Sequence, residues 1–114
     1  MAIKPILPSM REKKRYIAYE AIARDGSALR LDEVKAELSA AMLRFIGEKG
    51  FSAAGLIVLD DWHGSRGVIK VSHDYTDEAK AAMAMVTRIA SKAAVIRALG
   101  TSGILKKARK GIGG

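Results

Sequence analysis

Basic side chains gather at both ends of this chain of 114 residues, where they could bind a polyanion. Residues 1–15 carry a net charge of +4, residues 100–114 carry another +4, and the residues between them are electrically balanced. The formal net charge of +8 therefore comes from the two ends. A sequence pI near 10.0 favours a nucleic acid as the partner, ahead of an anionic membrane, and a role in solubility is the simplest alternative.

A second group with possible chemistry consists of Asp60, Asp61, His63, His73 and Asp74, which flank a predicted hairpin. Paired carboxylates bind hard divalent ions, so a metal-dependent nuclease could use the two neighbouring aspartates with either histidine. The simpler interpretation makes the two aspartates turn residues and Asp74 a strand end. The histidines lack the spacing of a ligand motif, and no nucleophile with an ordered base is visible. We therefore predict neither catalytic nor metal-binding residues in this chain.

The segment 100–103, Gly-Thr-Ser-Gly, precedes the last basic residues. It matches neither a P-loop nor a dinucleotide-binding fingerprint. We expect a turn from a strand into a short helix that starts at Thr101 or Ser102, and free amides at such a start could also bind phosphate. One or two turns of basic helix would be marginal alone and should become ordered when phosphates neutralise the charge.

The segment 66–73 tests whether the chain is an RNA-recognition motif, which uses strand aromatics to stack bases. Val68 and Lys70 stand where those aromatics are required, and Tyr16 and Tyr19 point to opposite faces of their strand. The sheet therefore lacks a stacking platform, and an open sheet face would suit protein contact. Exposed Val68 on such a face would need a cover.

Composition limits the remaining classes of protein. The chain has no cysteine, so it has no disulfide framework and no cysteine-based metal site. It has no apolar run of the roughly 20 residues that a membrane span needs, and we expect a cytoplasmic protein. Asn and Gln are also absent, which is typical of heat-adapted proteins. Trp62 could anchor a partner or cover the core.

The hydrophobic pattern predicts one α+β domain of the ferredoxin-like type, with order βαββαβ and both helices on one face of a four-stranded antiparallel sheet. A ligand-sensing module could use the same fold, because the fold alone does not determine function. The predicted regions are a basic arm at 1–12, the domain at 13–110 with its terminal basic helix at about 101–110, and a flexible tail at 111–114.

Strand alternation and helix caps place the elements inside this domain, and alternation in the first strand puts Ile17 and Tyr19 on one face and Ala18 on the other. Asp32 is the expected cap of the first helix and Gly50 its end. Thr76 is the expected cap of the second helix, whose buried apolar stripe includes Val86 and Ile89 and runs to Ala90. The apolar run 56–59 is typical of an interior strand. The expected strands are 13–24, 52–60, 67–73 and 93–99, with a connecting loop at 61–65.

Four segments of the sequence resemble the archaeal ribonuclease P protein component 2 family, the counterpart of a small eukaryotic RNase P/MRP subunit. They are 7–17, 43–50, 67–73 and 99–108, they follow the family order, and they extend over nearly the whole chain. The last segment, Leu-Gly-Thr-Ser-Gly-Ile-Leu-Lys-Lys-Ala, is the most specific. Ile104 and Leu105 depart from the more polar pair expected there.

This resemblance implies a non-catalytic subunit of the endoribonuclease that removes the leader from precursor tRNA. In that ribonucleoprotein the RNA performs the Mg²⁺-dependent cleavage, the protein supports the RNA and meets precursor tRNA only indirectly, and the protein chain itself binds no cofactor. The resemblance also implies a partner subunit with a TIM-barrel-like fold, and two such heterodimers joined through copies of the present chain.

The basic ends then become the predicted RNA contacts, which position the RNA without reading its sequence. If most of them reach phosphate, the log–log salt slope of RNA binding should be on the order of −5. The predicted RNA-binding residues are Arg11, Lys13, Lys14, Arg15, Thr101, Ser102, Lys106, Lys107, Arg109 and Lys110.

Overall fold

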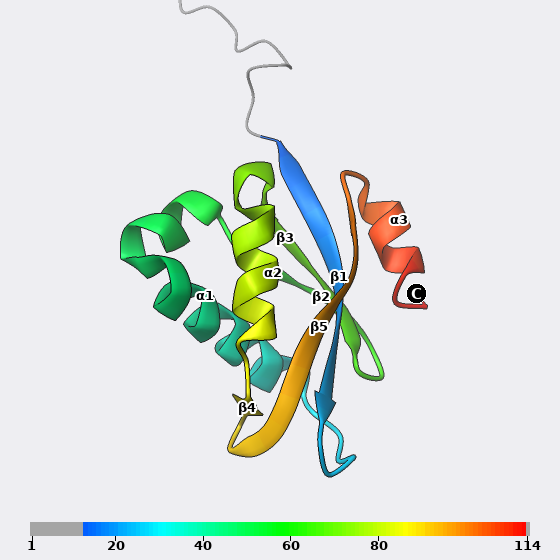
Figure 1. Cartoon of the computed structure of the whole chain (residues 1–114). Helices are drawn as coiled ribbons and strands as arrows, with labels where there is room; N and C mark the ends of the chain where they lie inside the picture. Colours follow the sequence, from blue (N-terminus) through cyan, green and yellow to red (C-terminus); the bar gives the residue numbers. More distant parts are fainter. Residues whose placement is uncertain (1–12, 114) are drawn as a thin grey trace, which may run out of the picture.

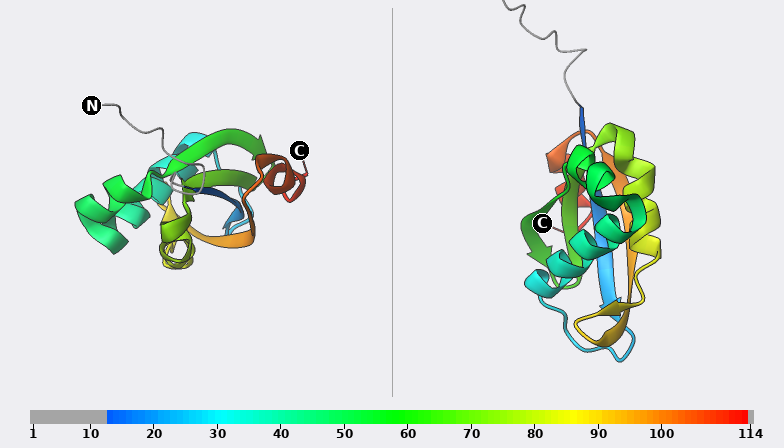
Figure 2. Two further views of the ribbon diagram at one scale, coloured as in Figure 1. Left: turned by 90° about the horizontal axis from the view of Figure 1, so that it is seen from above. Right: turned by 90° about the vertical axis from the view of Figure 1, so that its left-hand side faces the viewer.

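The computed structural model of the chain describes residues 13–113, so the predicted arm at 1–12 and residue 114 lie outside it. One antiparallel sheet has the strand order β2-β3-β1-β5-β4, with α1 and α2 on one face and α3 on the other (Figures 1 and 2). The four longer strands have the expected split-βαβ order. The elements are β1 (Lys14–Ala23), α1 (Leu31–Ala54), β2 (Ile57–His63), β3 (Arg66–Ser72), a 3-10 turn (His73–Tyr75), α2 (Thr76–Ala84), β4 (Arg88–Ile89), β5 (Lys92–Ser102) and α3 (Leu105–Lys110).

The strand β1 lies at the centre of the sheet and divides the core into two layers. Its side chains alternate, as predicted, so Ile17 and Tyr19 pack under α1 and α2 while Ala18 faces α3. Pairing with β3 on one side and β5 on the other satisfies both edges of β1. The larger core lies between the sheet and the two long helices, and the smaller one lies under α3.

The helix α1 is longer than the sequence predicted, because it continues past Gly50, the predicted end. Gly47 has φ 74° and ψ 175° and kinks the helix, whereas Gly50, the predicted end, remains helical. The helix stops at Gly55, whose φ of 59° is left-handed. Residues 52–54, predicted as strand, are therefore helical. Neither α1 nor any other helix of residues 13–113 is long and apolar enough to cross a membrane.

The predicted caps of both long helices are also displaced. Arg30 caps α1 in place of Asp32, and its backbone N–H donates to Glu33 Oε1 at 3.0 Å. Tyr75 caps α2, and Thr76 is already helical, with its hydroxyl donating to the His73 carbonyl at 3.0 Å. In both cases an acidic first turn marked the start of the helix correctly to within two residues.

The strand β2 is an edge strand, so the prediction of an interior strand at 56–59 was wrong. Its neighbour is β3 alone, and Ile57 is 50% exposed. The strand also continues through Trp62 and His63, which the sequence placed in a loop. Only Gly64 and Ser65 make the turn, and the left-handed φ of Gly64 suits a two-residue hairpin.

The fifth strand appears where the second helix was expected to continue. The helix α2 ends at Ala84, and β4 then pairs with the start of β5 through a turn at Ala90 and Ser91, both with positive φ. Val86 and Ile89 are buried, as predicted, but from an extended segment. The β-branched residues in 86–89 favour this extended backbone.

Candidate nucleic-acid interface

The start of β1 and the end of β5 lie side by side, and this brings the described parts of the two basic ends together. Tyr16 on β1 pairs with Ser102 on β5. The Arg15 guanidinium lies against the loop that follows β5, since a Cβ added to Gly103 would be 3.3 Å from Arg15 Nη1. Two segments almost 90 positions apart in sequence therefore contribute to one edge of the molecule.

The basic residues at and just before the start of β1 differ in their surroundings. Lys13 is exposed, whereas Lys14 Nζ would lie 3.3 Å from a Cβ added to Gly55. Arg15 donates from Nη1 to the Lys14 carbonyl at 3.2 Å. Within residues 13–113, neither Lys13 nor Arg15 forms an ion pair with a carboxylate. Arg11, the fourth predicted contact of this segment, lies outside the described residues.

The helix α3 is held to the sheet by a small apolar cluster. Ala108 and Ile112 are buried against Ala18 and Val68. Burial of an Ile or Val side chain contributes about 1.5–3 kcal/mol, which offsets the instability of so short a helix. Val68 is thus covered, so the sheet face expected to be open is closed at this point. Within the segment predicted as a flexible tail, Ile112 is 3% exposed and belongs to this cluster.

The Lys and Arg side chains of α3 point in three different directions around the helix. Successive residues are about 100° apart around a helix, so Lys107 and Arg109 flank the buried Ala108 on opposite sides. Arg109 points toward β2, where its Nε donates to Asp61 Oδ2 at 2.8 Å. The half-exposed Arg109 therefore ties α3 to the sheet and is already paired with a carboxylate.

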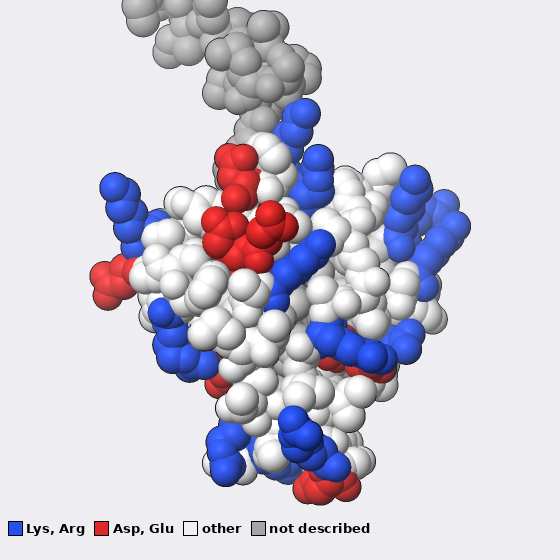
Figure 3. Space-filling view, in the orientation of Figure 1, with Lys and Arg blue, Asp and Glu red and all other residues white. Residues whose placement is uncertain are grey.

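Lys106 and Lys110 occupy the outer surface of α3 and are exposed. They are four residues apart and so share one face. Neither they nor Lys107 form an ion pair with any carboxylate in the described part of the chain. Figure 3 shows Lys and Arg side chains over α3 and over the start of β1. Lys106, Lys107 and Lys110, which have no carboxylate partner among residues 13–113, are the cations that a phosphate backbone would bind.

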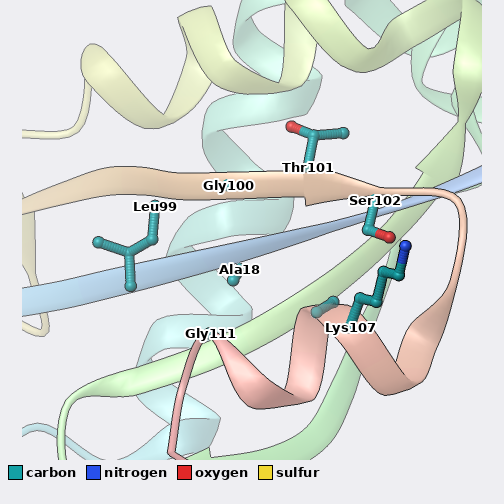
Figure 4. Close-up of a pocket in the computed structure, with 8 residues that line it drawn as sticks. Ala18, Leu99, Gly100, Thr101, Ser102, Lys107 and Gly111 are labelled. Carbon is teal, nitrogen blue, oxygen red and sulfur yellow. The ribbon is translucent and has the colours of Figure 1, made fainter.

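Thr101 and Ser102 are the last residues of β5 and do not start a helix, contrary to the prediction. The helix α3 begins at Leu105 after a bend, and Ser102 Oγ accepts a hydrogen bond from the Ile104 N–H at 3.0 Å. Ser102 points toward α3, and Thr101 points to the opposite side of the strand (Figure 4). The two predicted hydroxyl contacts therefore lie on different faces.

A cavity of about 420 Å³ lies between β5 and α3. It exists because three neighbouring positions are small: Ala18 on β1, Gly100 on β5 and Ala108 on α3. Ser102 and Lys107 also line it, and in Figure 4 the Lys107 ammonium points toward the Ser102 hydroxyl. Sequence reasoning placed both residues in the site but did not foresee the cavity, since strand register decides which small residues coincide.

The acids and histidines considered for metal binding are dispersed among separate pairs. Asp60 pairs with Lys35 at 2.5 Å, which lowers the pKa of Asp60, and Asp61 pairs with Arg109. His73 Nε2 and Asp74 Oδ1 are 3.1 Å apart. No three His, Asp or Glu side chains of residues 13–113 are grouped as a metal site would need.

Glu20 forms a charge cluster that the sequence analysis missed. Arg66 and Arg97 lie directly opposite it on the two neighbouring strands. Their side chains donate to the Glu20 carboxylate at 3.1 Å from Arg66 Nε and 2.8 Å from Arg97 Nη2. These two hydrogen bonds lower the pKa of Glu20, which is 8% exposed. Only strand register could have revealed this cluster, because the three residues are far apart in sequence.

Trp62 covers the core, which was one of its two predicted roles. It is partly buried against the larger core, and its ring centroid lies 6.4 Å from that of Tyr19. Tyr19 is fully buried beneath it, and burial raises the pKa of its phenol. Gly67 leaves room for the Tyr19 ring, since an added Cβ would approach Tyr19 Oη to 2.5 Å.

The opposite layer of the molecule exposes large apolar side chains. Leu43 and Phe45 on α1 and Met85 after α2 are each at least 41% exposed. Arg44 lies among them and pairs with Glu37 at 2.6 Å. This apolar surface is on the helix layer, across the sheet from α3.

Comparison with known proteins gives a family match over almost the whole described chain. The model of the Rpp14/Pop5 family matches residues 15–112. A protein of Methanosarcina acetivorans named ribonuclease P protein component 2 is 39% identical over 106 residues, which are 93% of this chain and 78% of that protein. A protein of Pyrococcus abyssi with the same name is 33% identical over 111 residues, covering 96% and 92% of the two chains.

A solved structure with the same fold is a chain in the cryo-EM structure of yeast ribonuclease MRP. The TM-score is 0.66, and the match covers 88% of this chain and 86% of that chain. Sequence identity is 13%, so this comparison supports the arrangement of strands and helices alone.

Proposed function

This chain belongs to the Rpp14/Pop5 family, and on that basis we propose that it acts as a protein subunit of ribonuclease P. The relatives that share 30–39% identity with it over most of its length carry the name ribonuclease P protein component 2. We propose that it binds the catalytic RNA of the enzyme that removes the leader from precursor tRNA, and that it does so in the cytoplasm, since these relatives are archaeal.

The observation that carries the RNA-binding part is the cationic surface formed by α3 and the start of β1. Lys106, Lys107 and Lys110 have no carboxylate partner among residues 13–113, and Arg15 lies beside the loop that leads into α3. Cations left without internal partners gain the most from phosphate, because counterions are released from the RNA when they bind. This surface carries no aromatic stacking platform, so it supports positioning of the RNA and not base readout.

We assign bond cleavage to the RNA and its Mg²⁺ ions and not to this chain. Two carboxylates of the sheet are already engaged, since Asp61 binds Arg109 and Glu20 binds Arg66 and Arg97. In this proposal the chain neutralises phosphate repulsion within the folded RNA. It should therefore reduce the Mg²⁺ concentration that the RNA requires.

The protein partners belong to the same proposal. We propose a heterodimer with a TIM-barrel-like subunit, and pairing of two heterodimers through copies of this chain. The exposed apolar residues Leu43, Phe45 and Met85 support a protein contact on the helix layer. Such a contact would leave the cationic surface on the other side of the sheet free for RNA.

The proposal is tested by purifying the tagged full chain from its native cells and identifying what accompanies it. The expected result is ribonuclease P RNA together with a TIM-barrel-like protein. The purified chain alone should not cleave precursor tRNA, and adding it to its cognate RNA and partner protein should lower the Mg²⁺ required for cleavage. Cleavage by the lone chain that disappears in Asp60→Ala would overturn the proposal in favour of a metal-dependent nuclease.

A further inference from the structure

The cavity between β5 and α3 is open because one strand position has no side chain. A Cβ added to Gly100 would meet no atom within 4 Å. The floor is formed by Ala18 and Leu99, and Ala108 closes the α3 side. At about 420 Å³, the cavity falls within the range of small-ligand sites and is larger than a lone phosphate needs.

The rim of this cavity has the chemistry of an anion site. Ser102 Oγ accepts the Ile104 N–H, which fixes the oxygen and leaves its own O–H to donate elsewhere. The Lys107 ammonium points toward that hydroxyl (Figure 4). No Asp or Glu lines the cavity. A ligand with a phosphate at one end and an uncharged, flat body at the other fits both the rim and the apolar floor.

We propose that this cavity receives one unpaired nucleotide of a bound RNA. The Lys107 ammonium and the Ser102 hydroxyl bind its phosphate, and the base or sugar lies against Leu99 and Ala18. A paired nucleotide cannot enter, because its base is stacked and held by its partner strand. The inference rests on the proposed RNA-binding function. It adds a preference for an unpaired position, which the surface lysines alone would not provide.

The test compares two RNA hairpins that differ by one bulged adenosine, each titrated with the full-length chain. The ratio of their dissociation constants measures the preference for an unpaired nucleotide. We expect the bulged hairpin to bind about fivefold more tightly than the hairpin without the bulge. This gain is at the low end of what one bound base contributes to affinity, because the cavity lacks an aromatic ring for stacking. Gly100→Val should abolish this preference, since its side chain occupies the cavity, and Gly100→Ala should reduce it less.

Two comparison variants separate the cavity from general charge. Lys110→Met should weaken binding of both hairpins equally and leave the ratio unchanged, whereas Lys107→Met should lower the ratio. Ala93→Val introduces the same valine side chain at an exposed position of β5 far from the cavity and should change neither affinity. Thermal melting of each variant confirms folding. NMR then locates the nucleotide: the amide resonances of Gly100 and Gly111 should shift when the bulged hairpin is added and should not shift with inorganic phosphate at the same concentration.

The outcomes distinguish this inference from the function on which it rests. If both hairpins bind the native chain equally, or if folded Gly100→Val keeps the preference, the cavity is not a nucleotide site and the RNA-binding surface remains. If phosphate alone reproduces the amide shifts, the site binds anions and not a nucleotide, and the inference is wrong. If neither hairpin binds, the proposed function fails as well.

Discussion

Replacing Lys106 and Lys110 with alanine tests the cationic surface at its most accessible point. Both side chains are exposed on the outer face of α3, and neither has a carboxylate partner among residues 13–113. Their removal should leave the fold intact, because α3 is held to the sheet by Ala108 and Ile112 on its other face. We expect the double variant to unfold at nearly the native temperature and to bind RNA less tightly.

The size of the loss follows from counterion release. Each phosphate contact contributes about 0.7 to 0.9 to the slope of log K against log salt concentration, so two lost contacts should reduce the slope by about 1.4 to 1.8. The electrostatic contribution of these contacts vanishes at about 1 M salt, so at about 0.15 M their loss should weaken RNA binding by about 15- to 30-fold. The loss should therefore grow as salt is diluted.

The assay is a titration of fluorescent ribonuclease P RNA with each variant at several salt concentrations. The matched control is the double variant Lys49→Ala and Lys80→Ala, which removes the same charge from exposed positions on α1 and α2. The control should change affinity by no more than about twofold, because those lysines lie across the sheet from α3. Equal losses in the two double variants would refute a localised surface and leave only an effect of net charge.

Three further predictions concern single side chains. Tyr19→Phe should leave the free energy of unfolding unchanged or raise it by up to about 1 kcal/mol, because the buried Tyr19 hydroxyl has no hydrogen-bond partner, and urea unfolding measures this. Because the pKa of Glu20 is lowered in the folded state, its ion pairs stabilise the fold fully above the ordinary pKa of 4.5, and this stabilisation is lost as the pH falls through the lower folded pKa. Glu20→Gln should therefore be less stable than the native chain at neutral pH and should lose less stability than the native chain on acidification. Asp61→Asn should release Arg109 for phosphate and so tighten RNA binding, while costing no more than about 1 kcal/mol of stability in thermal unfolding.

Local sequence signals predicted the parts of the fold that depend on alternation and capping. The two-residue period of β1 placed Ile17 and Tyr19 on one face and Ala18 on the other, as observed. Acidic first turns located both long helices to within two residues of their starts. The basic helix α3 was also expected, although it begins at Leu105 and not at 101 or 102.

The errors arose where tertiary contacts overrule local pattern. The apolar run 56–59 resembles an interior strand, yet β2 lies at the edge of the sheet and its Ile57 is 50% exposed. Three glycines near the end of α1 could each end a helix by residue type, and backbone conformation placed a kink at Gly47 and the end of the helix at Gly55. The charge cluster around Glu20 and the cavity at Gly100 depend on strand register, which single-sequence patterns do not specify.

The central claim, that α3 faces RNA while the helix layer does not, is tested most directly by site-specific photocrosslinking in reconstituted ribonuclease P. A photoreactive amino acid is placed at Lys110 on α3 in one sample and at Lys80 on α2 in another, with the cognate RNA and partner protein present. We predict crosslinks to RNA from position 110 and none from position 80. RNA crosslinks from position 80 with none from position 110 would contradict the account.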